Sequence, residues 1–188
     1  MPALPRRSAG FAVAGITLIE LMIVVVVLAL LAAIAVPRFF AAREAVHAGA
    51  AHQALLASLM SASAHAASTG ADVVACPGSA AGCRAGTHDW TAGWIVFADL
   101  DGDRLRDPGD TLVHRAAALG GRAQLRSTVG RTRIVFQPNG GAAGSNVTFT
   151  LCDGRGIAHA RSLVMNNTGA LRSETPPAAT AEACMKSM

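Results

Sequence analysis

The sequence contains no tyrosine and a single lysine, Lys186, among its 188 residues. Aromatic residues make up 4% of the chain, so it lacks the interleaved aromatic side chains on which the bases of single-stranded nucleic acids stack. The six histidines are scattered, without a recognisable Ser/His/Asp or Cys/His grouping for nucleophilic catalysis. No glycine-rich phosphate loop follows an expected strand. These absences argue against an enzyme and against a bound cofactor.

Cysteine is scarce, and all four cysteines follow the long apolar run near the N-terminus. They are Cys76, Cys83, Cys152 and Cys184. An even number in an exported domain favours disulfides, for which three connectivities are possible. Proximity favours a Cys76–Cys83 bond around a small loop, which leaves Cys152–Cys184 to hold the C-terminal tail. The six-residue gap within the first pair is wider than a typical zinc-ligand spacing, and no histidine pair completes a metal site.

One long hydrophobic run dominates the N-terminal part of the chain. Residues 16–36 make 21 positions, and only Thr17 and Glu20 among them are not apolar. About 20 apolar residues suffice for a helix to cross the hydrocarbon core of a membrane. A charged side chain at the centre of such a helix costs about 2.5–3.5 kcal/mol on insertion scales, so Glu20 needs compensation.

The residues leave more than one interpretation of this run open. A secretory signal would end at Ala33-Ile34-Ala35, a small-x-small cleavage site, although it would be longer than usual and would carry an acid in its apolar region. A plain membrane anchor needs only the length and the apolar character. In a processed anchor, Arg6 and Arg7 hold the preceding leader in the cytoplasm by the positive-inside tendency.

The helical pattern extends beyond the apolar run. After Pro37, apolar residues recur at three- and four-residue steps to about residue 68, and one stripe is expected from Leu55, Leu56, Leu59 and Met60. A helix of about 50 residues would be about 75 Å long, so its first half must lie in lipid or in a filament core. Pro37 predicts a kink or a local break, because it lacks the N–H that a helix interior uses.

Beyond Gly70 the pattern changes to short strands separated by turn residues. Strands are expected at residues 72–76, 94–99, 111–115, 123–127, 132–137, 146–152 and 162–166. One long helix followed by short strands predicts an α+β fold in which the helix packs on a mainly antiparallel sheet. The predicted organisation is a leader (1–15), a membrane or filament-core helix (16–36), an amphipathic helix (37–69), a β-rich domain (70–173) and a tail (174–188) that forms a loop held by Cys184.

The start of the apolar run resembles the processing site of type IV prepilins and type II secretion pseudopilins. It consists of Gly15, Ile16 and, five positions after the glycine, Glu20. In that family a membrane peptidase cuts after the glycine and methylates the new N-terminus, so the resemblance implies cleavage between Gly15 and Ile16. It also implies that Glu20 pairs with the N-terminal amine of a neighbouring subunit. Pro37 matches a helix-kinking proline of many pilins, whereas Ile16 replaces the usual phenylalanine.

A narrower resemblance covers the β-rich region. Cys76-Pro77, Gly93-Trp94-Ile95-Val96-Phe97 and Thr148-Phe149-Thr150-Leu151-Cys152-Asp153 resemble the GspH/FimT group of minor pilins and pseudopilins. The resemblance implies a type IV pilin-like fold. Some minor pilins of this group resemble DNA receptors for natural transformation with a Gly-Arg-x-Arg motif. The counterpart here is Gly169-Ala170-Leu171-Arg172, in which only the second arginine is present.

The C-terminal half of the chain is strongly basic. Eight arginines and one acidic residue, Asp153, lie between residues 111 and 172, a local net charge of +7 against +4 for the whole chain. Arginine clusters can neutralise DNA phosphates with salt-dependent affinity. The candidate DNA-binding residues are Arg126, Arg131, Arg133, Arg161 and Arg172. The alternatives are a solvated basic face, or a face that meets an acidic neighbour in a filament.

The turn between residues 99 and 110 carries four aspartates at positions 1, 3, 5 and 12 of a calcium-loop template. Arg104 stands where the template needs a glycine for a sharp turn, and Arg104 and Arg106 offset the negative charge. The sequence therefore predicts a turn between strands rather than a metal site.

Together these features predict a minor pilin or pseudopilin, a non-enzymatic structural subunit of a type IV pilus or a type II secretion pseudopilus. It would cross the bacterial inner membrane once, with its C-terminal domain in the periplasm. The expected partners are the prepilin peptidase and methylase, other major and minor pilins or pseudopilins and the inner membrane. The alternatives are a pilus-associated DNA receptor, a type II secretion pseudopilin H that contributes to protein export, and a plain secreted binding protein.

Overall fold

The structure is a computed structural model, and it describes residues 15–142 and 144–186. The expected leader, apart from Gly15, lies outside the described residues. Contacts divide the chain into two units, Met1–Phe39 and Phe40–Met188. The first unit contains the start of the long helix α1, and the second contains the rest of α1 and all the strands.

Helix α1 extends from Leu18 to Thr69. It ends at Gly70, whose φ of +72° is a left-handed conformation and whose N–H bonds to the Ala66 carbonyl at 3.0 Å. Pro37 lies inside α1, and the helix continues through it, so a local break expected there is not observed. A proline removes one backbone N–H donor, and the backbone hydrogen bonds before and after that position hold the helix together.

The buried face of α1 consists of small and apolar residues at helical spacing. These residues are Ala48, Ala51, Leu55, Ser58, Leu59, Ala62 and Ala66. Leu55 and Leu59 belong to the stripe that the sequence predicts, and Leu56 is partly buried, but Met60 is 60% exposed. The expectation for Met60 was wrong because each helical residue turns about 100° from the last, which carries the position after Leu59 away from the core.

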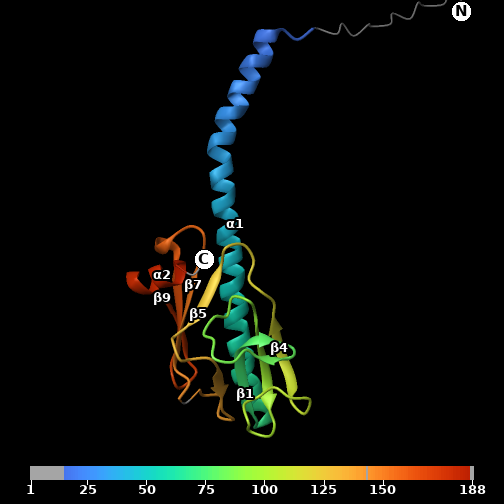
Figure 1. The fold of residues 1–188 in the computed structure, drawn as a ribbon, viewed down its shortest axis with the longest axis vertical. Coiled ribbons are helices and arrows are strands. Elements are labelled where there is room, and N and C mark those ends of the chain that lie inside the picture. The colour runs from blue at the N-terminus through green and yellow to red at the C-terminus, as the bar shows by residue number, and fades with distance from the viewer. Residues whose placement is uncertain (1–14, 143, 187–188) are drawn as a thin grey trace, which may run out of the picture. The chain divides into compact units, whose positions relative to one another are not determined.

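Two antiparallel sheets pack against the second half of α1, on different sides of it (Figure 1). The first sheet has the strand order β2-β1-β3-β4 and consists of β1 (Asp72–Ser79), β2 (Gly82–Cys83), β3 (Trp94–Asp99) and β4 (Thr111–Ala116), with β6 (Ile134–Phe136) paired to β1. The second sheet has the order β5-β7-β8-β9 and consists of β5 (Gln124–Ser127), β7 (Val147–Cys152), β8 (Arg161–Met165) and β9 (Leu171–Glu174). A short 3-10 helix, η1 (Ile157–His159), connects β7 to β8. The α+β pilin-like fold expected from the sequence is confirmed.

Two tryptophans join α1 and both sheets in one core. The indole N–H of Trp94 donates to the Ser58 hydroxyl of α1 at 3.0 Å, and that of Trp90 donates to the Ser127 hydroxyl of β5 at 3.1 Å. Both tryptophans are fully buried. The Trp90 ring also meets Phe149 of β7 edge-on, with ring centroids 5.0 Å apart. The packing of the domain therefore depends on side chains that precede or begin β3.

The C-terminal part is more regular than the sequence predicted. Strand β9 was not expected, and the tail expected to form a loop contains helix α2, Ala178–Met185. The loop expectation was wrong because proline is unfavourable in a helix interior but is tolerated at the position before a helix. Pro177 occupies that position, and the alanines that follow favour a helix. The Cys152–Cys184 disulfide fastens α2 to the end of β7.

Candidate functional site

The N-terminal end of α1 holds the residues expected for processing and assembly. Gly15 and Ile16 precede the helix, and Ile16 is 78% exposed. The Thr17 hydroxyl accepts a hydrogen bond from the Glu20 N–H at 3.3 Å, and the Thr17 carbonyl accepts one from the Leu21 N–H at 3.1 Å. Thr17 therefore caps α1. The Thr-x-x-Glu pattern of a capping box would have revealed this role from the sequence.

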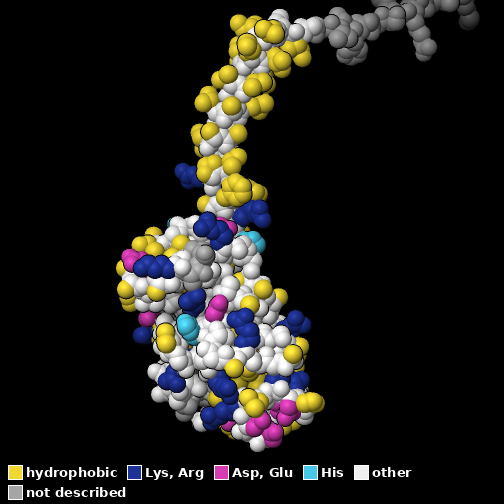
Figure 2. Space-filling model, viewed as in Figure 1, with side chains coloured by type: hydrophobic (Ala, Val, Ile, Leu, Met, Phe, Trp, Pro, Cys, Tyr) yellow, Lys and Arg dark blue, Asp and Glu magenta, His cyan; other side chains and the backbone are white. Residues whose placement is uncertain are grey.

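The first part of α1 is not covered by its own fold. An 18-residue window of this helix has a mean hydropathy of 3.1, and none of it is buried. Figure 2 shows hydrophobic side chains along this part of the helix. Glu20 lies in the first turn of α1, near the N-terminal end of the apolar run, where a carboxylate costs less on insertion than at the centre. By length and composition, this part of α1 fits a segment that crosses a membrane.

The four cysteines form two disulfides, and none of them is free. Cys76 of β1 and Cys83 of β2 are joined, with Cα atoms 5.6 Å apart, and this bond clamps the hairpin between the two strands. Cys152 of β7 is joined to Cys184 of α2, with Cα atoms 6.2 Å apart. These are the pairs that proximity in the sequence favoured.

The arginines proposed for DNA binding lie on different faces of the second unit. Arg126 of β5 pairs with Thr150, and Arg172 of β9 pairs with Val164. Because side chains alternate along a strand, this register places Arg126 and Arg172 on one face of the second sheet. Arg161, at the start of β8, lies on the other face. Figure 2 shows basic side chains scattered over the visible surface rather than gathered in one patch.

Several of these arginines have partners within the chain. Arg131 donates to a loop carbonyl at 2.8 Å, and Arg133 donates to the Arg104 carbonyl at 2.9 Å. Arg172 forms an ion pair with Glu174 at 3.3 Å, although its side chain is 73% exposed. The structure therefore does not assemble the five arginines into one binding surface.

The turn between β3 and β4 is closed by bonds between carboxylates and amides. Arg104 has a φ of +61°, the left-handed conformation that the calcium-loop template assigns to glycine. The Asp99 carboxylate accepts two backbone N–H bonds of the turn, both at 3.0 Å. Burial raises the pKa of Asp99, its amide hydrogen bonds oppose the rise, and the charge of Asp110 adds to it. Among the described residues, Asp99, Asp101 and Asp103 form the group that could hold a metal ion, with ligand oxygens within 4.8 Å of one another.

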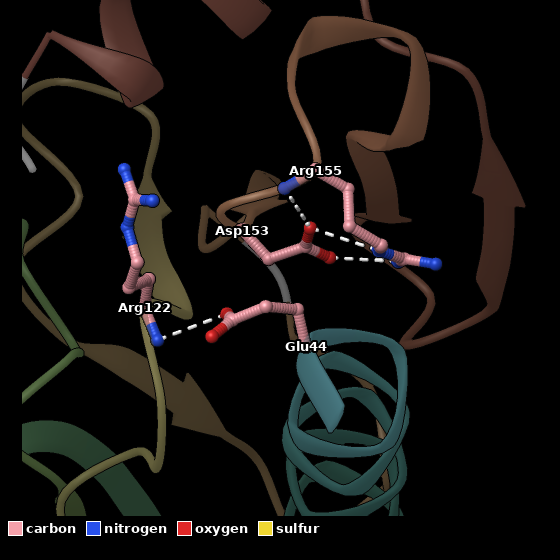
Figure 3. Close-up of polar contacts among 4 residues, drawn as sticks. All are labelled: Glu44, Arg122, Asp153 and Arg155. Carbon is pink, nitrogen blue, oxygen red and sulfur yellow. Dashed lines mark hydrogen bonds and ion pairs between the residues drawn. The ribbon is translucent and has the colours of Figure 1, made fainter. Parts of the chain in front are cut away.

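A polar cluster that the sequence did not reveal joins α1 to the loops before β5 and after β7 (Figure 3). Glu44 of α1 accepts the backbone N–H of Arg122 at 3.0 Å. Asp153, whose side chain is 1% exposed, accepts two side-chain N–H groups of Arg155 at 2.9 and 2.7 Å and its backbone N–H at 2.9 Å. Burial alone would raise the pKa of Asp153, but the bonds from Arg155 outweigh it and hold that pKa below its ordinary value.

Replacing Asp153 by asparagine is expected to lower the free energy of unfolding by about 1–3 kcal/mol at pH 7, because Arg155 loses a charged partner. The lowered pKa means that ionised Asp153 stabilises the fold above its unfolded-state pKa of about 3.9. This contribution disappears as the pH falls through the lower pKa of the folded state. Urea unfolding at pH 7 and at about pH 3 measures both effects, with the exposed acid Glu182→Gln as control. An unchanged pH dependence in Asp153→Asn would contradict the assignment.

Comparison with known proteins decides the family. A family model described as type II transport protein GspH matches residues 51–169. The chain belongs to the GspH family. The matched region contains the C-terminal part of α1, from residue 51 onward, and every strand except β9. The family assignment therefore rests on the folded domain and confirms the GspH/FimT resemblance of the sequence.

Two solved structures share the fold of this GspH-family chain. Both are of the type IV minor pilin FimU from Pseudomonas aeruginosa, in space groups P21 and P65, with sequence identities of 16% and 17% and TM-scores of 0.51 and 0.52. The alignments cover 73% and 70% of this chain and 90% and 94% of the FimU chains. At this level of identity the likeness shows the fold alone. No curated protein matches the sequence.

Proposed function

We propose that this GspH-family protein is a minor pilin or pseudopilin, a non-enzymatic structural subunit of a type IV pilus or a type II secretion pseudopilus. The observation that carries the proposal is the apolar first part of α1, which its own fold leaves uncovered. Such a helix is stable in lipid before assembly and among other helices afterwards. The two sheets of the second unit provide the surface for contacts with other pilins or pseudopilins.

The proposal places residues 16–36 across the inner membrane and the second unit in the periplasm. The two disulfides support this location, because disulfides persist in oxidising compartments and are rare in the cytosol. Within the membrane, Glu20 remains a buried carboxylate without a counter-charge from its own helix. We propose that assembly supplies one, the N-terminal amine of Ile16 in a neighbouring subunit.

The proposal predicts that the prepilin peptidase cleaves the chain between Gly15 and Ile16, and this cleavage can be tested directly. A Cβ atom on Gly15 would meet nothing within 4 Å, so a substitution there leaves the fold undisturbed. Gly15→Phe is expected to block trimming, because the peptidase must accommodate the residue before the cut. The mass of the product made together with the peptidase measures the effect, with Gly10→Phe as the matched control.

The alternatives give different masses in the same experiment. An unsubstituted chain whose product begins at Val36 would show an ordinary secretory signal. A Gly15→Phe product that still begins at Ile16 would refute the prepilin interpretation.

The arrangement of the arginines favours a structural role over a DNA receptor. They lie on different faces, and Arg172, the one arginine that matches the receptor motif, is paired with Glu174. The family description refers to type II transport, whereas the two structural neighbours are type IV minor pilins. The proposal therefore includes both filament systems, with pseudopilin H as the alternative that contributes to protein export.

A further inference from the structure

A cavity of about 390 Å³ lies between α1 and the second sheet. Its polar lining comes from four separate segments: His52 and Gln53 of α1, Arg155 and His159 between β7 and β8, Arg161 at the start of β8, and Ser173 of β9. His52 and Ser173, 121 positions apart in the sequence, meet with Nε2 and Oγ 3.3 Å apart. The fold thus gathers two imidazoles, two guanidinium groups, an amide and a hydroxyl around one cavity.

The guanidinium group of Arg155 is fixed in place. Asp153 accepts bonds from its Nε and Nη2 at 2.9 and 2.7 Å, and this pair leaves Nη1 on the side away from the carboxylate (Figure 3). Glu44, the other acid near Arg155, accepts the Arg122 backbone N–H. An arginine whose Nε and Nη2 are already bound to a carboxylate loses little conformational entropy when its Nη1 binds a further group.

The charge of the lining is of one sign. Among the described residues that line this cavity, no side chain is acidic. Asp153 balances the charge of Arg155 from a buried position, and Arg161, His52 and His159 provide further nitrogen donors. An anion in the cavity would therefore meet donors from several directions and no carboxylate on the cavity wall.

Two other cavities differ in this respect. The cavity of about 450 Å³ beneath α2 contains Arg126 and His88, but Glu174 also lines it. The cavity of about 230 Å³ at β9 contains Arg172, whose partner is again Glu174. In both, an acidic group near the arginine opposes the binding of an anion.

We propose that the cavity of His52, Arg155, His159 and Arg161 binds a phosphate group. Guanidinium groups bind phosphate oxygens through paired N–H donors, and such charge-assisted bonds are roughly twice as strong as neutral ones. Imidazole and hydroxyl groups supply further donors to the same oxygens. The phosphate belongs either to a soluble metabolite or to the head group of a membrane lipid. This proposal goes beyond the structural role and does not depend on it.

Isothermal titration of inorganic phosphate into the full chain, in a non-ionic detergent at low salt, tests the site. Saturable binding is expected, and Arg161→Gln and His159→Gln are each expected to weaken it about tenfold. Both side chains are exposed, so neither change should disturb the core. Arg172→Gln removes the same charge outside the cavity and should leave the affinity unchanged. Melting curves of each variant verify that it is folded.

A second titration, in micelles that contain phosphatidylglycerol, distinguishes a lipid head group from a soluble metabolite as the source of the phosphate. Competition between the lipid and inorganic phosphate identifies a head group, and undiminished phosphate binding identifies a soluble ligand. Absence of saturable binding would overturn the proposal. An equal loss of affinity in Arg172→Gln and Arg161→Gln would also overturn the proposal. Such a result would show that phosphate is attracted to the basic protein as a whole rather than bound in the cavity.

Discussion

Glu20→Ala is expected to reduce the incorporation of this chain into filaments by at least tenfold while leaving its membrane insertion intact or improved. Insertion improves because a carboxylate is removed from an apolar helix. If Glu20 pairs with the amine of the neighbouring subunit as proposed, assembly is expected to fail, because the amine then enters the filament core without a counter-charge. Breaking one side of a buried ion pair costs about 3–5 kcal/mol. The measurement is the ratio of the chain in sheared filaments to that in membranes.

The local structure allows the effect of the Glu20 charge to be measured without disturbing the helix cap. The cap at the start of α1 uses the backbone N–H of Glu20 and the hydroxyl of Thr17, and neither is changed in Glu20→Ala. Glu20→Gln, which keeps the size and polarity, should fail like alanine if the charge matters. Glu182→Ala, at an exposed acid of α2, serves as control. Normal incorporation of Glu20→Gln would rule out the charge-pairing role.

Trp90→Ala is expected to destabilise the second unit by about 3–5 kcal/mol, a large part of the 5–15 kcal/mol typical of a folded domain. The indole is fully buried, contacts Phe149 edge-on and donates to Ser127 at 3.1 Å. Its loss leaves a cavity where the loop before β3 meets the second sheet. Calorimetry of the full chain in detergent should show a melting transition lowered by more than 10 °C, or no transition.

Matched variants separate the parts of this effect. Trp90→Phe keeps a ring against Phe149 and loses the hydrogen bond to Ser127, so we expect a smaller loss of about 1–2 kcal/mol. Met60→Ala, which removes an exposed apolar side chain of α1, should change stability by less than about 0.5 kcal/mol. If the Trp90→Ala variant melted at the same temperature as the unsubstituted chain, the stability of the two sheets would not depend on the Trp90 side chain.

Elements that depend on local pattern could be predicted from the sequence. The bounds of α1 follow from apolar spacing and from Gly70, and most strands follow from β-rich runs between turn residues. Those signals lie within a few neighbouring residues, so they survive without knowledge of the fold. Strand β9 lacked such a signal, because Leu171–Glu174 is short and mostly exposed and is held in place by β8.

The candidate sites, like the helices and strands, could be predicted from the sequence only where they depend on a local pattern. Gly15, Ile16, Glu20 and the Cys76–Cys83 pair stand out in the sequence because the proposed processing signal and a short disulfide loop are both local patterns. The basic segment was also visible, but its net charge did not show that Arg161 and Arg172 point to opposite faces of one sheet. That depends on strand register, where a shift of one residue exchanges the faces.

By itself, the sequence determined that this protein has an apolar helix long enough to cross a membrane, a disulfide-bonded β-rich domain and a GspH-type pattern of residues. Only the tertiary structure decided that Asp153 fixes Arg155 and that His52 lies beside Ser173 in a cationic cavity. The physical reason is the range of the interactions. Helix and strand propensities act between near neighbours, whereas the cavity joins residues 121 positions apart that only the packed fold brings together.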